Sequence, residues 1–394
     1  MSQNNRDFDV VIYGATGFTG RLVAEYLQAE YGGSGLKWAM AGRSADKLAA
    51  VRDEMGVSKD VALITANSDD AASLEAMCAR TRAVITTVGP YQLYGEPLVA
   101  AAVTSGTDYV DLCGEPAWMR DIIEGYDAKA KQSGARIVLS CGFDSIPFDM
   151  GVFALQQHAK ANHGGACPRI RGRVRAMQGT FSGGTAASFM ETMKRAGAQP
   201  EILGWLKDPF SLVPDFDGPK QPHGAKPIFE EDLNSWSAPF IMASINTKNV
   251  HRSNALMGHA YGADFVYDEM MFAGPGEKGK AMAEGIANHN TFGDNPPKPG
   301  EGPSKDERDN GFYDVLFIGT TQAGAITTLS VKGDKDPGYG STSKMIAEAA
   351  LTLIHDRPHN EVGGGVYTSA PAMGQALIDR LEAHAGLKFT LETA

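Results

Sequence analysis

The sequence predicts an α/β fold in two parts: a Rossmann-type doubly wound parallel sheet, and a second α/β domain with a mixed, largely antiparallel sheet. Three observations favour this fold. Six apolar, strand-length segments alternate with helical patterns over the first 150 residues, as in parallel sheets with crossover helices. Arg169 to Gln178 then alternates apolar and arginine side chains, the pattern of an antiparallel strand with one buried face. The length of 394 residues also exceeds one ordinary hydrophobic core.

Composition argues against several classes of protein. A net charge of −11 argues against nucleic acid as a partner, because such binding needs many basic side chains to displace phosphate counterions. No apolar run reaches the roughly 18 residues of a membrane span and the first residues are polar, so we expect a cytoplasmic protein without a transmembrane segment. Four cysteines without a C-x-x-C pair indicate reduced thiols and no metal site.

The first strand, 10–13, runs directly into a glycine-rich turn and then into a helical pattern. A glycine at every third residue removes Cβ atoms where a diphosphate would approach the backbone N–H groups and the helix N-terminus. We therefore expect the turn to bind a dinucleotide, and a purely structural tight turn is the alternative. The expected contact residues are Gly14, Thr16, Gly17, Phe18, Thr19 and Gly20.

The residues after the second expected strand, 36–41, indicate which nicotinamide cofactor binds. NAD sites place an acidic residue there to accept a hydrogen bond from the ribose 2′-hydroxyl, whereas a 2′-phosphate needs cationic and hydroxyl donors. No acid follows this strand; Arg43, Ser44 and Lys47 stand there instead. The pattern predicts NADP(H), with a merely solvated strand end as the alternative.

Two later loops should line the nicotinamide end of the same crevice. In a Rossmann-type order the fourth strand lies beside the first, so the loop after it faces the cofactor. The residues placed there are Gly89, Pro90, Tyr91 and Tyr94 after the fourth strand, 83–88, and Asp144 and Ser145 after the sixth strand, 137–140. We expect Gly89, Pro90 and Tyr91 to contact the cofactor.

The second half of the chain gives less specific signals. The arginines of 169–178 could meet an anionic substrate, but a solvated or dimer-facing strand is the favoured interpretation. Trp205 to Pro239 is poorly periodic and rich in Pro, Asp and Gly, so we expect a long loop that forms part of the substrate wall and moves on ligand binding. We also expect a strand at 241–245.

Several motifs together resemble the saccharopine dehydrogenase-like NADP-binding family: GATGFTG (14–20), AGRS (41–44), VGPYQLYG (88–95), YVDLCGE (109–115) and GFDSIPFDMG (142–151). KPGEGPS (298–304), DPGYGSTSKMIAEAALTL (336–353) and GGGVYTSAPAMG (363–374) are similar to its trans-acting enoyl reductase branch. The resemblance implies an NADP-binding Rossmann domain at 1–150, a second α/β domain at 151–337, and a C-terminal segment, 338–394, that returns to the first domain. Mycobacterial members of that branch reduce a carbon–carbon double bond in long-chain polyketide lipids.

Three functions are compatible with these observations. The favoured one is NADPH-dependent reduction of a conjugated C=C bond in an acyl or lipid-like substrate, with peripheral lipid contact and a homodimer as further options. The first alternative is a saccharopine-type amino-acid oxidoreductase, in which Arg252, Ser253 or the strand arginines would bind carboxylates. The second alternative is a non-catalytic NADP-binding scaffold.

Enoyl reduction would need a hydrogen-bond donor for the carbonyl oxygen and a proton source for the α-carbon. The candidate catalytic residues are Tyr91, Tyr94, Asp144 and Ser145. Tyr91 is the preferred donor, and an aromatic wall for the nicotinamide is the alternative role for its ring. Asp144 could instead cap the helix that starts at Pro147.

The cofactor assignment can be tested with Arg43→Ala. We expect this variant to weaken NADPH binding by about 1.5–3 kcal/mol, the contribution of a hydrogen bond to a charged group, and to leave NADH binding almost unchanged. Calorimetric titration with both cofactors measures the difference. An equal loss for NADPH and NADH would show that Arg43 does not bind the 2′-phosphate.

Overall fold

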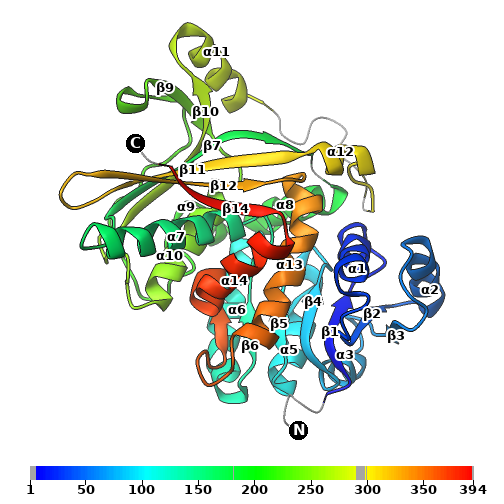
Figure 1. Cartoon of the computed structure of the whole chain (residues 1–394). Helices are drawn as coiled ribbons and strands as arrows, with labels where there is room; N and C mark the ends of the chain where they lie inside the picture. The colour runs from blue at the N-terminus through cyan, green and yellow to red at the C-terminus, as the bar shows by residue number, and fades with distance from the viewer. Residues whose placement is uncertain (1–5, 181, 290–297, 299, 393–394) are drawn as a thin grey trace.

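The computed structural model describes residues 6–180, 182–289, 298 and 300–392. Figure 1 shows two β-sheets, with the orange and red C-terminal helices lying between them. Within the described residues, no helix combines the length and the apolar character needed to cross a lipid bilayer.

The first sheet has seven parallel strands in the order β13-β6-β5-β4-β1-β2-β3. In that order they are Gly365–Tyr367, Arg136–Val138, Asp108–Val110, Thr81–Thr86, Phe8–Tyr13, Trp38–Gly42 and Ala62–Thr65. The strand order reverses between β1 and β4, so a crevice for a ligand is expected beyond their carboxyl ends. The Rossmann-type sheet expected from the sequence is confirmed.

Helices cover both faces of this sheet because its central strand is apolar on both sides. Val10 and Ile12 of β1 lie in one hydrophobic cluster with α1 and α13, whereas Val11 and Tyr13 lie in a second cluster with α3, α5 and α6. This follows from the alternation of side chains along a strand. The helices are α1 (Phe18–Tyr31), α2 (Ala45–Glu54), α3 (Ala71–Cys78), α5 (Glu96–Ser105), α6 (Pro116–Ser133) and α13 (Thr342–Leu351).

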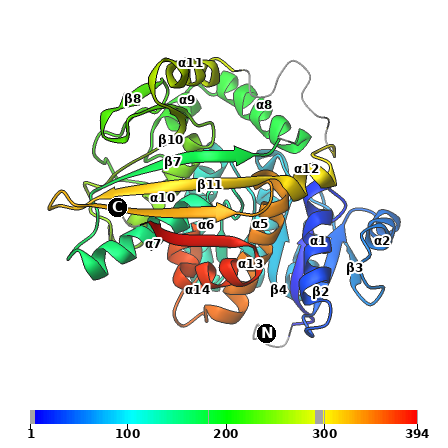
Figure 2. The ribbon, with the colours of Figure 1, turned by 45° about the horizontal axis from the view of Figure 1, so that its top comes forward.

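The second sheet also has seven strands, in the order β14-β12-β11-β7-β10-β9-β8. They are Leu387–Glu392, Ile326–Gly333, Phe312–Thr320, Arg169–Gln178, Val266–Gly274, Ser235–Pro239 and Ile228–Glu230. Figure 2 shows the central strands running side by side. Only β7 and β10 pair in parallel, so the sheet is mixed and largely antiparallel, as expected. The expectation that β7 belongs to a purely antiparallel arrangement is wrong on its β10 side.

The C-terminal segment contributes to both sheets. β13 pairs with β6 at the edge of the first sheet, and β14 pairs with β12 at the edge of the second. Between them, α14 (Ser369–His384) packs on α7 (Ile146–Asn162). One hydrophobic cluster therefore extends from β1 and α1 through α7 to β11 and β12, which fixes the two sheets relative to each other.

The remaining helical elements are short or belong to the second half of the chain. They are α4 (Tyr91–Tyr94), α8 (Gly183–Ala198), α9 (Glu201–Lys207), η2 (Glu231–Leu233), α10 (Ala243–Leu256), α11 (Gly276–Ala287), α12 (Lys305–Asn310), η3 (Pro337–Ser341) and η4 (Thr352–Asp356). The strand expected at 241–245 is wrong, because α10 begins there. A five-residue apolar run is too short for its periodicity to distinguish a strand from the start of a buried helix.

The long loop expected from Trp205 to Pro239 is only partly irregular. It includes the end of α9 and the strands β8 and β9. Its first part is anchored, because Lys248 Nζ donates to the Asp208 carbonyl oxygen at 2.6 Å and Arg252 Nη1 donates to that of Leu212 at 2.8 Å. Leu212 is fully buried. The segment around Leu212 is therefore part of the core.

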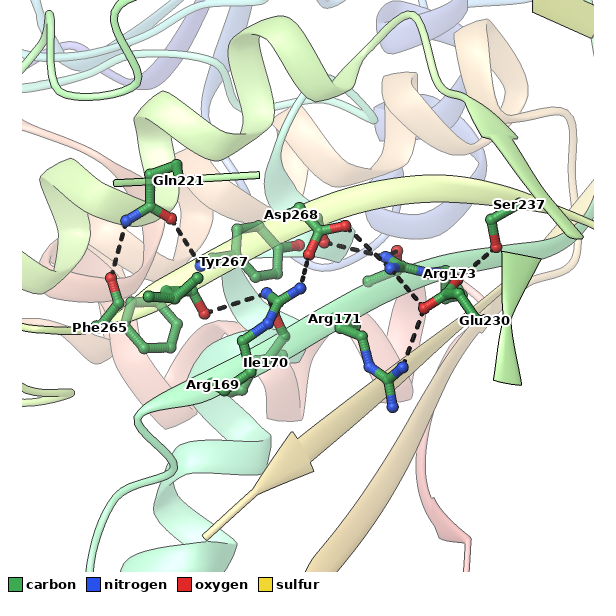
Figure 3. A network of polar contacts seen from close by, with 12 residues as sticks. Arg169, Ile170, Arg171, Arg173, Gln221, Glu230, Ser237, Phe265, Tyr267 and Asp268 are labelled. Atoms are coloured by element: carbon green, nitrogen blue, oxygen red, sulfur yellow. Dashed lines mark hydrogen bonds and ion pairs between the residues drawn. The ribbon is translucent and has the colours of Figure 1, made fainter. Parts of the chain in front are cut away.

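The arginines of β7 pair with acids of neighbouring strands and are buried or partly exposed. Figure 3 shows the guanidinium groups meeting carboxylates of the neighbouring strands. Arg173 is 1% exposed, and its Nε donates to Glu230 Oε1 at 2.7 Å while Nη2 lies 2.9 Å from Asp268 Oδ2. Arg171 pairs with Glu230 at 3.0 Å. The expectation of a solvated face is wrong at Arg173, because acids on β8 and β10 lie across from it and pair with its buried guanidinium group.

This buried ion network predicts a large difference between two acidic residues. Glu230→Ala leaves Arg173 buried without its main counter-ion, so the free energy of unfolding should fall by about 3–5 kcal/mol. Asp232→Ala removes an acid whose side chain is 57% exposed and which pairs with Arg171, and should cost at most about 1 kcal/mol. Urea denaturation measures both. Equal effects would mean that the network contributes as a surface pair does.

Candidate cofactor and active site

The three glycines of the turn differ in what a Cβ atom would contact at each position. Gly14 has φ +90°, and a Cβ there would lie 2.6 Å from Val88 Cγ2. A Cβ on Gly20 would lie 2.2 Å from the Gly14 carbonyl oxygen, so Gly20 lets α1 pack against the turn. Gly17 is exposed, and a Cβ there would meet only the Gly14 oxygen, at 3.2 Å. Gly14 and Gly20 are therefore needed for the fold, whereas a Cβ on Gly17 would make a single tight contact, with the Gly14 carbonyl oxygen.

The start of α1 fits an anionic group. Gly17 precedes the helix and supplies no capping side chain, and the first turn of α1 contains no acidic residue. The first backbone N–H groups of the helix are thus available to a diphosphate, which the helix dipole also favours. Thr16, Phe18 and Thr19 are partly exposed around this point. These residues fit the diphosphate of a dinucleotide.

The end of β2 carries the residues expected to select the cofactor. Ser44 Oγ accepts a hydrogen bond from the Lys47 backbone N–H at 3.3 Å and caps α2. The side chains of Arg43 and Lys47 are exposed. The charge of Arg43 is close enough to Tyr13, at the end of β1, to act on its pKa, although burial dominates and raises that pKa. Cationic groups therefore stand beside the turn where a 2′-phosphate would lie.

The loop after β4 is held by a buried carboxylate that the sequence did not single out as functional. Glu115, 3% exposed, accepts hydrogen bonds from the backbone N–H groups of Tyr91 and Gln92, both at 2.9 Å. Burial raises the pKa of Glu115. An acid followed by Pro116 directly after the fifth strand was the available signal, because it starts α6 at the edge of the crevice. Glu115 thus fixes α4 and the Gly89–Pro90 segment, whose peptide bond is cis.

Tyr91 lies inside the first domain. Its hydroxyl donates to the Thr86 carbonyl oxygen at 3.1 Å and accepts from the Leu112 N–H at 3.0 Å. The side chain is 5% exposed and burial raises its pKa well above the usual value. Its ring contacts Trp118 with centroids 5.6 Å apart. The hydroxyl proton of Tyr91 therefore already makes a hydrogen bond within the protein. Tyr94, on the same loop, is 41% exposed.

Asp144 and Ser145 face different surroundings although they are adjacent. Ser145 Oγ donates to Asn246 Oδ1 at 3.2 Å and accepts from Asn249 Nδ2 at 2.6 Å, so it contacts α10. Burial raises the pKa of Asp144 to about 7. No described residue donates a hydrogen bond to the Asp144 carboxyl group, and Oδ2 lies 3.5 Å from the position that a Cβ on Gly114 would take. Among the candidate residues, Asp144 is thus the one whose carboxyl group receives no hydrogen bond from a described residue.

A residue of η3 contacts the start of α1 at the glycine-rich turn. The ring of Tyr339 in η3 meets the ring of Phe18 edge to face, with centroids 5.2 Å apart. The Tyr339 hydroxyl accepts from the Ser182 N–H at the start of α8 and lies 3.1 Å from Thr185 Oγ1. The charge of Asp144 contributes to the raised pKa of Tyr339, after burial. Tyr339 is a residue that the sequence analysis did not single out.

A cavity of about 560 Å³ lies elsewhere, at the amino ends of the parallel strands. Its arginines donate to carbonyl oxygens at helix ends: Arg136 to Leu353 in η4 at 2.8 Å, and Arg6 to Ser105, the last residue of α5. These contacts offset the partial negative charge of helix C-termini. The cavity is therefore separate from the crevice at the glycine-rich turn.

Comparisons with known proteins agree with this geometry. The family model for the saccharopine dehydrogenase NADP binding domain matches residues 10–138, which hold the turn and most of the first sheet. A putative trans-acting enoyl reductase of Mycobacterium tuberculosis (strain H37Rv) is 42% identical, with 97% of each chain covered. The chain belongs to the trans-acting enoyl reductase family. Another trans-acting enoyl reductase, from Mycobacterium bovis (strain BCG), is 38% identical with 97% of each chain covered.

A solved structure extends the comparison to the fold. Saccharopine dehydrogenase (L-Glu forming) from Saccharomyces cerevisiae superposes with a TM-score of 0.54 at 12% identity, over 98% of this chain and 100% of that chain. This member of the trans-acting enoyl reductase family therefore has the saccharopine dehydrogenase fold. The expectations of an NADP(H) cofactor and of an NADP-dependent oxidoreductase are confirmed.

The two kinds of glycine can be separated by mutation. Gly17→Val should keep the chain folded and weaken NADPH binding by about 100-fold or more, since the new side chain occupies the diphosphate position. Gly20→Val should lower the melting temperature sharply, because its Cβ overlaps backbone atoms of Gly14 and Ala15. Circular dichroism and fluorescence titration measure the two effects. Unfolding of the Gly17 variant would show that this glycine is mainly structural.

Proposed function

We propose that this protein reduces a conjugated carbon–carbon double bond of an acyl substrate with NADPH, and that Asp144 provides the proton. The observation that carries the proposal is the Asp144 carboxyl group, which is partly buried on the loop after β6, at the carboxyl end of the first sheet, and receives no hydrogen bond from a described residue. With its pKa near 7, the group is protonated in a large fraction of molecules at neutral pH, as a general acid requires.

The proposed reaction divides the work between the cofactor and this chain. When bound, NADPH supplies a hydride to the β-carbon of the double bond. The α-carbon then needs a proton, and Asp144 holds one on its carboxyl group. Burial raises the pKa values of Cys113 and Tyr339, and the charge of Asp144 adds to both shifts. Both groups are therefore neutral near pH 7. Of these three groups, Asp144 is therefore the one that titrates near pH 7.

The other candidate residues support this choice because their hydroxyl protons already take part in hydrogen bonds. Tyr91 uses its hydroxyl proton on the Thr86 carbonyl oxygen, and Ser145 uses its own on Asn246. In our proposal Tyr91 therefore holds the loop after β4 and forms an aromatic wall, in place of the donor role that the sequence favoured. Ser145 acts through its backbone position beside Asp144.

An apolar rim beside the crevice supports an acyl substrate. Leu93 and Tyr94 on α4 are 50% and 41% exposed, and Met190 and Met193 on α8 are 64% and 47% exposed. The two helices are joined by a hydrogen bond from Gln92 Nε2 to Thr192 Oγ1 at 3.0 Å. Exposed apolar side chains gathered at a site edge are typical of surfaces that bind apolar ligands. We assign this rim to the acyl chain.

The saccharopine-type alternative has less support, because its carboxylate-binding arginines are engaged. Arg173 is buried against Glu230 and Asp268. Arg252 donates to the carbonyl oxygens of Leu212 and Val366, at 2.8 and 2.6 Å. Neither guanidinium group is therefore available for the carboxylate of a small amino acid.

The proposal is tested with Asp144→Asn in an assay of NADPH oxidation against trans-2-dodecenoyl-CoA. We expect kcat to fall by about 10²-fold or more, the usual contribution of a positioned acid, with NADPH affinity unchanged. In the parent protein kcat should fall as the pH rises through about 7, because the acid loses its proton there.

Tyr91→Phe is the matched control, since it removes a hydroxyl group from the neighbouring loop and keeps the ring. We expect it to retain kcat within a few-fold. Parental turnover by Asp144→Asn would refute the role of Asp144, and a 10²-fold loss in Tyr91→Phe would return the donor role to Tyr91. No turnover of any enoyl thioester by the parent would refute the proposed substrate class.

A further inference from the structure

The loop that carries Asp144 has an unusual backbone. Five described residues other than glycine have positive φ, and two of them, Ser140 at +61° and Ser145 at +141°, lie in the six residues 140–145. Side chains with a Cβ avoid this region unless the surrounding structure holds them there. Ser145 directly follows Asp144 in the chain, so its φ sets the direction in which the preceding backbone and the Asp144 side chain leave the loop.

Two asparagines of the second domain hold Ser145. Asn249 Nδ2 donates to Ser145 Oγ at 2.6 Å, and Ser145 Oγ donates to Asn246 Oδ1 at 3.2 Å. Asn246 Nδ2 donates in turn to Glu269 Oε2 at 2.9 Å. All four side chains are at most 2% exposed. In this arrangement Ser145 donates its one hydroxyl proton to Asn246 and accepts from Asn249.

Asn249 is hard to explain by stability alone. Its Oδ1 is buried without a described hydrogen-bond partner, and an unsatisfied buried amide oxygen is unfavourable. Its described side-chain hydrogen bond goes to a serine whose φ is itself unfavourable. Two local costs meeting next to a candidate acid are typical of a functional constraint.

We propose that Asn249 and Asn246 are positioning residues that hold Ser145 in its strained conformation and thereby aim the Asp144 carboxyl group into the crevice. This inference rests on the proposed function, because it gives Asp144 the role of the acid. It also gives the second domain a task in the chemistry: α10 and β10 set the geometry of a loop that belongs to the first sheet.

The test compares Asn249→Ala with Asn254→Ala. Asn254 is also a buried asparagine of α10, but it donates to the Gly262 carbonyl oxygen and accepts from the Tyr261 N–H, both at 2.8 Å. We expect Asn249→Ala to lower kcat for trans-2-dodecenoyl-CoA about tenfold or more, with NADPH affinity within twofold of the parent. Asn254→Ala should retain kcat. Equal losses in the two variants would reduce Asn249 to a general packing residue and overturn the inference.

A double-mutant cycle shows whether Asn249 acts through Ser145. Glycine adopts the φ of residue 145 without strain, and Ser145→Gly also removes the hydroxyl group that Asn249 contacts. In that background Asn249→Ala should change kcat by less than about twofold, because the shared interaction is already gone. A full tenfold loss in both backgrounds would overturn the inference.

One measurement does not depend on turnover and separates this inference from the proposed function. The carboxyl carbon of Asp144, assigned by its loss in Asp144→Asn, can be titrated by ¹³C NMR in the parent and in both asparagine variants. We expect the midpoint to move toward that of a hydrated carboxyl group in Asn249→Ala only. An unchanged midpoint in Asn249→Ala overturns the positioning role, whereas parental turnover in Asp144→Asn overturns only the proposed function.

Discussion

The close approach of α1 to the glycine-rich turn is the constraint on which the rest of the site depends. A Cβ on Gly20 would lie 2.2 Å from the Gly14 carbonyl oxygen, so the helix can start directly above the end of β1 only because residue 20 has no side chain. That placement brings the free N–H groups of α1 to the switch point between β1 and β4. It also brings Phe18 into contact with Tyr339, whose hydroxyl group accepts a hydrogen bond from the Ser182 N–H at the start of α8, so η3 and α8 lie beside the same point.

The polar groups around the crevice are distinguished by the bonds that they already make. The Glu115 carboxylate accepts two backbone N–H groups, the Tyr91 hydroxyl is used in two directions, and the Ser145 hydroxyl joins the asparagines of α10. Such groups are rigid because any movement would leave a buried donor or acceptor unpaired. Asp144 stands out among them, since burial alone accounts for its raised pKa. A hydrogen-bonded frame around one acid that receives no hydrogen bond from a described residue is what a preorganised site requires.

The sequence was sufficient to predict those features whose decisive residues lie close together in the chain. A strand, three glycines and a helix start lie within 14 consecutive residues, so the dinucleotide turn, the parallel sheet and the cationic end of β2 could be predicted. The sequence was insufficient where the decisive contact is distant. Ser145 and Asn246 are 101 residues apart, and Arg173 and Glu230 are 57 apart, so no pattern around either member reveals its partner. Tyr91 was favoured for its place in the loop, and nothing local showed that its hydroxyl group points back to Thr86.

The raised pKa values of four acidic residues make the stability of the protein depend on pH. Burial raises the pKa values of Asp111, Asp144 and Asp149 to about 7 and that of Glu269 to about 8, above the value of about 4 expected in the unfolded chain. Between pH 4 and 8 the folded state therefore binds more protons than the unfolded state, and these groups make the protein less stable as the pH rises. Three of the four carboxyl groups accept hydrogen bonds that partly offset this cost, such as those from Cys113 and Ser140 to Asp111. Asp144 is partly buried and accepts no hydrogen bond from the described residues, and an acid with a raised pKa and no such compensation at the carboxyl end of the sheet is better explained by chemistry than by stability.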